Sequence, residues 1–155
     1  MPAARLGLYQ GCNDGKTNAQ MMPRDATFHC NATSLDVRRV LSDLRAHLKA
    51  RHIDEDDCSK IELALAEALN NIVEHAYTLG GPGTITLLLN IGDDQLTCEL
   101  RDAGKEMPGL VLPGATGPDV TSTLAALPEG GFGWSLIHAL TVHLPYMRDG
   151  SENRL

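Results

Sequence analysis

The sequence lacks the features that mark zinc domains, membrane proteins and secreted proteins. Its four cysteines are scattered and form no C-x-x-C pair, and its nearest histidine pairs have a poor spacing for two ligands on one helical face. No apolar run approaches the roughly 20 residues of a membrane-spanning helix, and the N-terminus lacks the continuous apolar core of a signal peptide. We therefore expect a cytoplasmic protein with reduced, buried thiols.

An excess of positive charge is also absent. The chain has 155 residues and a formal net charge of −7, which argues against a surface for nucleic acid or anionic membranes. Nucleotide binding stays open, because helix N-termini and backbone amides can hold phosphates without basic side chains. With 43% hydrophobic residues, the chain is long enough for one packed domain. We expect its partners to be proteins or a small ligand, with no direct contact to nucleic acid or membrane.

The most regular stretch is Lys60–Tyr77, KIELALAEALNNIVEHAY, which has no Gly or Pro and is rich in Leu, Ala, Ile and Glu. This composition predicts a helix. Its apolar side chains form one stripe, made of Ile61, Leu65, Ala68, Leu69, Ile72 and Ala76. Glu67 and Asn71 lie on the opposite arc one turn apart, so a carboxylate and an amide project side by side. Taken alone, this polar face is typical of a solvated helix surface, and His75 at its border is typical of a structural histidine.

The residues before this helix predict a short strand over Arg24–Asn31 and a second amphipathic helix over Leu35–Ala50. Ser34 has the character of its N-cap. Its basic residues, which are Arg38, Arg39, Arg45 and Lys49, are expected on a solvated face. Residues 1–22 show little periodicity, so we expect a loose leader followed by one domain over residues 23–155. Within the leader, Gly11–Thr17 is similar to a phosphate-binding loop, but its glycines are one residue too close and no strand precedes it, so that reading is rejected.

The residues after the helix predict a β-hairpin, with strands over Thr84–Ile91 and Gln95–Arg101. The second strand leads directly into Asp102. The segment from Lys105 to Gly130 has several Pro and Gly and no sustained periodicity, which predicts a functional loop or lid, with a short helix near Ser122–Leu127.

The chain then continues through the glycine-rich turn of residues 130–133 into an apolar helix over Trp134–Leu140. A final hairpin is expected from Thr141–Arg148 and the stretch after Gly150.

Three pieces now stand in order: a helix with Glu67 and Asn71, a strand that ends in Asp102-Ala103-Gly104, and a glycine-rich turn that enters a helix. Each piece alone is weak. Together they resemble the N, G1 and G2 boxes of the GHKL (histidine-kinase-like) ATPases. The sequence EALNNIVEHAY is similar to the E-x-x-x-N-x-x-x-H-[AG]-[YF] form of the anti-sigma regulatory factors that are serine-protein kinases, and the C-terminal turn and hairpin are similar to theirs. The resemblance covers residues 26–155.

The resemblance implies an α+β fold of the Bergerat type. This is a two-layer sandwich in which a mixed, mostly antiparallel sheet is packed on one face by three helices. It also implies ATP and Mg²⁺ as cofactors. In the family, the asparagine that matches Asn71 coordinates Mg²⁺ together with the phosphates, and the glutamate that matches Glu67 acts as general base.

The other two boxes are implied to hold the nucleotide. The aspartate that matches Asp102 accepts a hydrogen bond from the adenine amino group, and Gly104 lets the base approach the backbone. Gly131 and Gly133 are expected to present amides to the phosphates at a helix N-terminus. His75 is left out of this set.

Two departures from the family pattern bear on activity. Glu106 stands where the G1 box usually has its second glycine, although many short-lid members also lack that glycine. Glu129 lies just before the G2 glycines, where some kinase members have a basic residue, and Lys105 is the one cation of the expected lid segment. Phosphoryl transfer depends on positive charge around the γ-phosphate, so binding without turnover stays an alternative.

The first hypothesis is therefore an ATP-dependent serine/threonine kinase that is also an anti-sigma factor. It would bind a sigma factor in one state and phosphorylate an anti-sigma-factor antagonist in the other. A homodimer is expected, with the Leu35–Ala50 helix and the first strand as the contact surface. The alternative is a non-catalytic nucleotide-binding module that regulates by protein binding alone. The ATP-binding half of a histidine kinase is disfavoured, because no dimerisation helix with a phospho-accepting histidine precedes the domain.

Overall fold

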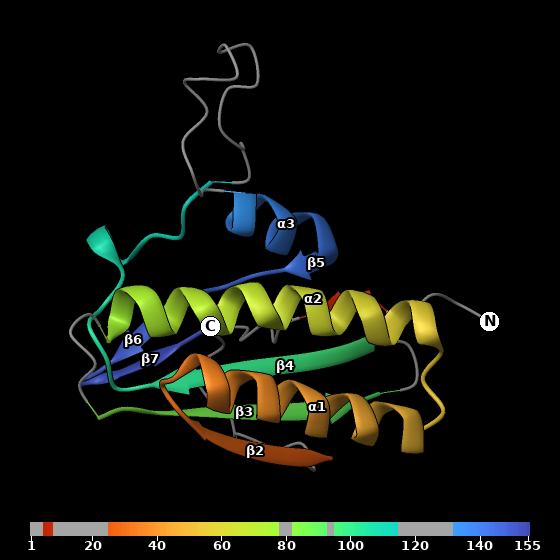
Figure 1. Cartoon of the computed structure of the whole chain (residues 1–155). Helices are drawn as coiled ribbons and strands as arrows, with labels where there is room; N and C mark the ends of the chain where they lie inside the picture. Colours follow the sequence, from red (N-terminus) through yellow and green to blue (C-terminus); the bar gives the residue numbers. More distant parts are fainter. Residues whose placement is uncertain (1–4, 8–24, 78–81, 93–94, 115–131) are drawn as a thin grey trace, which may run out of the picture.

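The protein is an α+β sandwich with a mixed sheet on one side and helices on the other (Figure 1). The computed structural model describes residues 5–7, 25–77, 82–92, 95–114 and 132–155. Its strands are β1 Arg5–Gly7, β2 Ala26–Asn31, β3 Thr84–Ile91, β4 Gln95–Asp102, β5 Thr141–His143, β6 Met147–Asp149 and β7 Glu152–Arg154. Its helices are α1 Ser34–Ala50, α2 Glu55–Asn71 and α3 Phe132–Leu140, with a π-helical turn over Ile72–Ala76 and a 3-10 turn over Pro108–Leu110.

The sheet combines antiparallel hairpins with one parallel insertion. Its main path is β2-β3-β4-β1-β5, and β7 pairs with both β4 and β6. Strands β2, β3, β4, β7 and β6 pair antiparallel, whereas β1 is parallel to both of its neighbours. The expected mixed, mostly antiparallel sheet is confirmed.

The three helices cover one face of this sheet, α1 beside α2 and α2 beside α3 (Figure 1). Apolar side chains of α1 and α2 meet the alternating inward residues of β3 and β4, and Leu44, Leu48, Leu69, Leu87 and Leu89 are fully buried there. The stripe predicted on α2 is confirmed at Ile61, Leu65, Ala68 and Leu69, all buried. This core fixes the orientation of α2 and so directs the polar arc of that helix.

Both long helices begin at a side-chain cap, although not always at the expected residue. Thr33, not Ser34, caps α1, and its hydroxyl accepts the amide hydrogen of Asp36. Asp54 caps α2 and accepts from the amide of Asp57, so the helix begins five residues before Lys60. Such caps satisfy donors that the first helical turn leaves without a backbone partner.

Three further expectations change with the structure. Arg5–Gly7, within the expected loose leader, forms strand β1 between β4 and β5, while the domain boundary itself stays a prediction. The expected last hairpin is shorter, because β5 separates from it to pair with β1, and β6 and β7 make the hairpin. Arg45 is not simply solvated, since its guanidinium forms ion pairs with Glu55 and Glu62 across the α1–α2 interface.

Cys30, Cys58 and Cys98 are free and buried, as expected. Burial raises the pKa of the Cys98 thiol to about 12. Because the thiolate is the reactive form, we expect Ellman's reagent at pH 8 to leave Cys98 unmodified in the native protein and to modify it in denaturant. Peptide mapping by mass spectrometry measures this, with the denatured protein as control, and rapid native labelling of Cys98 would contradict the buried position.

Candidate functional site

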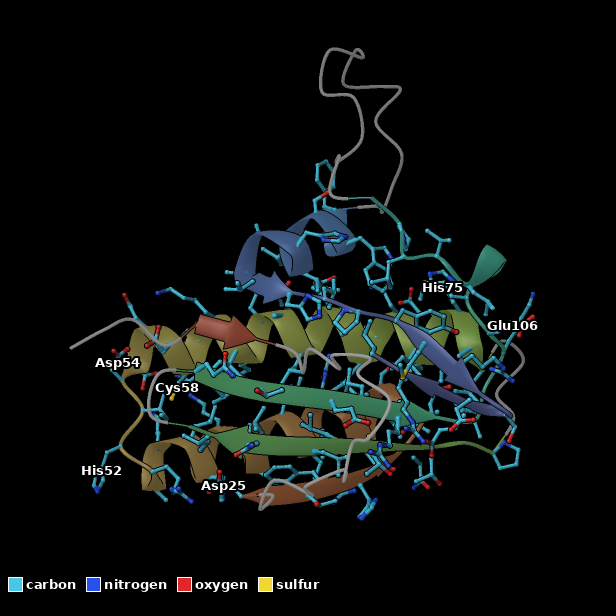
Figure 2. The ribbon with its side chains drawn as sticks, turned by 180° about the vertical axis from the view of Figure 1, so that it is seen from behind. Asp25, His52, Asp54, Cys58, His75 and Glu106 are labelled. Carbon is cyan, nitrogen blue, oxygen red and sulfur yellow. The ribbon has the colours of Figure 1, made fainter. Side chains whose placement is uncertain are left out.

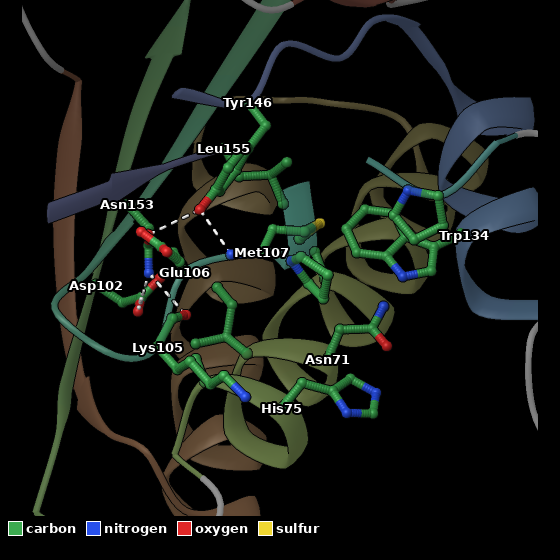
Figure 3. Close-up of a pocket in the computed structure, with 15 residues that line it drawn as sticks. Asn71, His75, Asp102, Lys105, Glu106, Met107, Trp134, Tyr146, Asn153 and Leu155 are labelled. Atoms are coloured by element: carbon green, nitrogen blue, oxygen red, sulfur yellow. Dashed lines mark hydrogen bonds between the residues drawn. The ribbon is translucent and has the colours of Figure 1, made fainter. Parts of the chain in front are cut away.

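A pocket of about 420 Å³ opens at the C-terminal end of α2 (Figure 3). This volume is within the range of small-molecule sites. Figure 2 shows His75 and Glu106 near this end of the molecule and Asp54 and Cys58 at the opposite end of α2. The pocket is lined from four elements: the end of α2 with its π turn, the segment after β4, helix α3, and the C-terminal hairpin. Asn71 and Asp102, both predicted site residues, are among its lining residues.

The end of α2 brings Glu67 and Asn71 against α3. A Cβ atom placed on Gly133 would lie 2.6 Å from Oε2 of Glu67 and 3.6 Å from Nδ2 of Asn71. The three residues thus meet at the first turn of α3, and their polar arc is not the solvated surface that the isolated helix indicated. Asn71 Nδ2 is buried without a hydrogen-bond partner among the described residues. An unpartnered buried polar group is costly, so it marks a position where a ligand would complete the site.

The helix widens directly after Asn71 into the π turn of Ile72–Ala76. Such turns are rare and are often found at functional sites. The turn ends with the carbonyl of Ala76 accepting the amide hydrogen of Lys105 at 2.9 Å. It therefore joins the helix that carries Asn71 to the chain that follows Asp102.

Asp102 is the last residue of β4 and is only 6% exposed. Its Oδ1 accepts the amide hydrogen of Gly104 at 2.8 Å and a hydrogen of the Asn153 amide at 3.0 Å. Gly104 is needed for space, because a Cβ there would lie 2.7 Å from the Cβ of Ala76 and 2.8 Å from its carbonyl oxygen. The absence of a side chain at Gly104 thus makes room for the π turn, while the predicted approach of the base to this residue stays a prediction.

Replacing Gly104 with Ala is expected to lower the free energy of unfolding by about 1–3 kcal/mol, because the added methyl group overlaps backbone and side-chain atoms of Ala76. Urea denaturation measures this difference. Gly109→Asn is the matched control, since Gly109 has a left-handed φ of 64° and open space around it, and Asn tolerates that conformation. Equal stability of the two variants would contradict the tight packing.

Residues 103–107, which we name the strap, are fixed at both ends by their backbone amides. Ala103 donates to the hydroxyl of Tyr77 at 3.1 Å, and Met107 donates to the hydroxyl of Tyr146 at 3.0 Å. Burial raises the pKa of Tyr77, so its hydroxyl stays protonated at neutral pH. The strap therefore has a defined path along the pocket rather than the freedom of an open loop.

Glu106 does not leave an isolated negative charge beside the pocket. Its Oε2 lies 3.3 Å from Nε of Arg148, which also donates from Nη1 to the carbonyl of Gly104 at 3.2 Å. The residue that replaces the usual glycine thus holds the strap to the last hairpin.

Sequence reasoning did not identify three residues of this site. Trp134 lines the pocket from α3, and Tyr146 and Asn153 line it from the C-terminal segment (Figure 3). Trp134 was expected only as part of an apolar helix, and the other two only as part of a hairpin. A polar residue in a three-residue strand gives no periodic signal, so nothing in the sequence distinguished Asn153 from a surface residue.

Some expectations lie outside the described residues. These are Gly131, Glu129, the Walker-like stretch of residues 11–17 and the short helix expected at Ser122–Leu127. The described start of the lid is attached to α3, since Nε2 of His138 lies 2.9 Å from the carbonyl oxygen of Pro113. Within the described ranges there is no cluster of three or more histidine, cysteine, aspartate or glutamate residues suited to a metal ion. Those ranges also contain no helix long and apolar enough to cross a membrane.

Residues 30–155 match the family of histidine kinase-like ATPase domains, and the chain belongs to this family. The family predicted from the three boxes is therefore confirmed. Among curated proteins, the chain is similar to the serine-protein kinase RsbW of Bacillus mycoides (strain KBAB4) and of Bacillus cereus (strain G9842). Each is 34% identical over 95 residues, which are 61% of this chain and 59% of the relative.

A solved structure supports the same fold. The RsbU and RsbW domains of a protein from Mycobacterium tuberculosis align with a TM-score of 0.55 at 20% identity, over 83% of this chain and 30% of that one. At this identity the comparison speaks for the fold alone.

Proposed function

We propose that the protein is an ATP-binding anti-sigma factor with serine/threonine kinase activity toward an anti-sigma-factor antagonist. The observation that carries this proposal is the convergence of the three boxes. Asn71 and Asp102 line one pocket, Gly104 lies against its wall, and Glu67 and Gly133 meet beside it. Membership of an ATPase domain family implies ATP as the ligand, and the relatives named serine-protein kinase support the reaction class.

The two ends of the pocket differ in chemistry, and in this proposal one end binds the adenine base of ATP and the other binds its phosphates. Asp102 offers a carboxylate oxygen to the adenine amino group, and Met107 supplies apolar surface around the base. At the other end, the first turn of α3 offers backbone amides for phosphates. This division selects adenine by hydrogen bonding and positions the phosphates beside Glu67.

The residues present also fit Mg²⁺. Asn71 lines the pocket, and its buried Nδ2 has no hydrogen-bond partner among the described residues, so it is available to donate to a phosphate oxygen. The oxygen of the same amide is a suitable hard ligand for an ion that keeps several waters and phosphate oxygens. Bound Mg²⁺ would supply positive charge that offsets charge on the phosphates. In phosphoryl transfer, the Glu67 carboxylate would accept the proton of the acceptor serine hydroxyl.

A non-catalytic nucleotide-binding module is the second candidate. It is favoured by one observation: among the described residues that line the pocket, Lys105 is the one Lys or Arg side chain. A site with little positive charge near the γ-phosphate would bind ATP more readily than it would transfer phosphate.

Transfer of the γ-phosphate of ³²P-labelled ATP to a purified cognate antagonist tests the proposal. The proposal expects labelled antagonist when the wild-type chain and Mg²⁺ are present, and no label when the chain is omitted. ATP binding measured by calorimetry without any transfer would reject the kinase and leave the binding module. The partners remain part of the proposal, and a pull-down with purified candidate sigma factors tests whether the protein binds a sigma factor.

A homodimer and a cytoplasmic location complete the proposal. Leu35 on α1 is 78% exposed, which supports α1 and β2 as the contact surface, because large exposed apolar side chains are often covered by a partner. Sedimentation of the wild type and of Leu35→Glu tests this. A wild type that stays monomeric at all concentrations rejects the dimer.

A further inference from the structure

Asn153 is buried at the end of the pocket where Asp102 lies, and its side chain contacts both Asp102 and the strap. It lies in β7, is 4% exposed, and pairs in register with Asp102 of β4. Its Nδ2 contacts Asp102 Oδ1 at 3.0 Å and the carbonyl oxygens of Gly104 and Lys105 at 3.3 Å each. One side chain therefore contacts the aspartate and two carbonyl groups of the strap (Figure 3).

The orientation of the Asn153 amide is determined by which of its neighbours donate hydrogen bonds and which accept them. Its Oδ1 accepts from the hydroxyl of Tyr146 at 2.8 Å and from Nη1 of Arg148 at 2.5 Å. A guanidinium can only donate and an ionised carboxylate can only accept. The amide nitrogen must therefore face Asp102, and Arg148 and Tyr146 prevent it from turning over.

The two carboxylate oxygens of Asp102 therefore differ in their hydrogen bonding. Every hydrogen bond that it receives from the described residues goes to Oδ1, from Gly104 and Asn153. Its other oxygen has no partner among these residues, although the side chain lines the pocket. A carboxylate with one oxygen held and the other available is suited to a single exocyclic amino group.

We propose that Asn153 is the positioning residue for base recognition, and that it holds Asp102 by Oδ1 so that the second carboxylate oxygen accepts the amino group of adenine. Tyr146 and Arg148 orient the amide of Asn153, and Arg148 extends the same network to Glu106 on the strap. This inference rests on the proposed nucleotide site. It gives Glu106 a place in that site, as the outer end of the network.

The test compares ATP with purine riboside triphosphate, which is the same nucleotide without the 6-amino group. We expect the wild type to bind ATP more tightly, and Asn153→Leu to lose roughly tenfold in ATP affinity, the effect of one hydrogen bond to a charged group. Affinity for the analogue should change little, because it makes no bond to Asp102. Isothermal calorimetry provides both dissociation constants.

Two further variants are measured in the same way, one that disturbs the network less than Asn153→Leu and one that serves as a control. Tyr146→Phe removes one hydroxyl, which orients the amide of Asn153 and also accepts from the amide of Met107. This variant is expected to fold even where Asn153→Leu does not, and to reduce the ATP preference by a smaller factor. Asp149→Asn is the matched control, because it removes an ion pair to Arg154 in the same hairpin without touching the network, and its preference should equal that of the wild type. Equal weakening of both nucleotides, or an unchanged preference in Asn153→Leu and Tyr146→Phe, overturns the inference.

Hydrogen exchange separates this inference from the proposed function. If the wild type bound neither nucleotide, the proposed function would fail, but the position of Asp102 could still be measured. The Gly104 amide donates to Asp102 Oδ1, so its exchange should be faster in Asn153→Leu and Tyr146→Phe while the rest of β4 keeps its protection. Unchanged exchange at Gly104 would show that Asn153 does not position the carboxylate.

Discussion

Glu67→Gln is expected to slow phosphoryl transfer to the antagonist by roughly 10²–10⁴-fold, the usual contribution of a general base. Gln keeps the shape and the contact with Gly133, where a Cβ would lie 2.6 Å from Oε2, but it cannot accept the serine proton. ATP affinity should stay nearly unchanged, because Glu67 does not line the pocket. Single-turnover transfer from labelled ATP measures the rate, and calorimetry measures the affinity.

The matched control for this prediction is Glu74→Gln. Glu74 lies in the π turn seven residues further on and is exposed, so its replacement removes the same charge without touching α3. Its transfer rate should equal that of the wild type. If Glu67→Gln transferred phosphate at the wild-type rate, another group would have to be the base. If wild type and variant both bound ATP without transfer, the non-catalytic module would be the better description.

Asn71→Ala is expected to reduce ATP affinity in the presence of Mg²⁺ by at least roughly tenfold, because even the outer partners of metal ligands contribute that much. The Nδ2 of Asn71 is buried without a hydrogen-bond partner among the residues that the structure describes, so its removal should cost the apo protein little stability. In the variant, adding EDTA should change ATP affinity less than it does in the wild type. Titrations with and without Mg²⁺ give the four dissociation constants.

Asn70→Ala is the control for this second prediction. Asn70 is adjacent to Asn71 on α2 but does not line the pocket, so its replacement should leave ATP affinity unchanged. Equal loss in the two variants would indicate a general disturbance of the helix end. No loss in Asn71→Ala would remove Asn71 from the site.

The parts of the fold that were predictable from sequence are those with strong local signals. The 3.6-residue pattern of Ile61, Leu65 and Leu69 and the alternation of Leu96, Cys98 and Leu100 each identify an element and its buried face. The family resemblance then supplied the order in which distant elements meet. Strand β1 gave no such signal, because three residues that gain order only by pairing with β4 and β5 have no periodicity of their own.

The site was predictable only where the chain follows the family pattern. Asn71 and Asp102 were identified by their resemblance to the family's boxes, but the pairing of Glu106 with Arg148 is a contact between residues far apart in sequence. From sequence, Glu106 was simply a departure beside a nucleotide. Asn153 could not be identified from the sequence for a related reason. Its contact with Asp102 depends on the register of β7 against β4, and register is set by tertiary structure.

The support that Asn153 of β7 gives to Asp102 also has a consequence for truncated chains. Tyr146, Arg148 and Asn153 follow helix α2 and strand β4 by more than 40 residues of sequence, yet these three residues complete the base end of the pocket. A chain that ends before Asn153 would carry the phosphate-end residues but an unsupported Asp102. At the proposed nucleotide site, such a truncated chain would keep the residues of the phosphate end and lose its preference for adenine over a purine without the amino group.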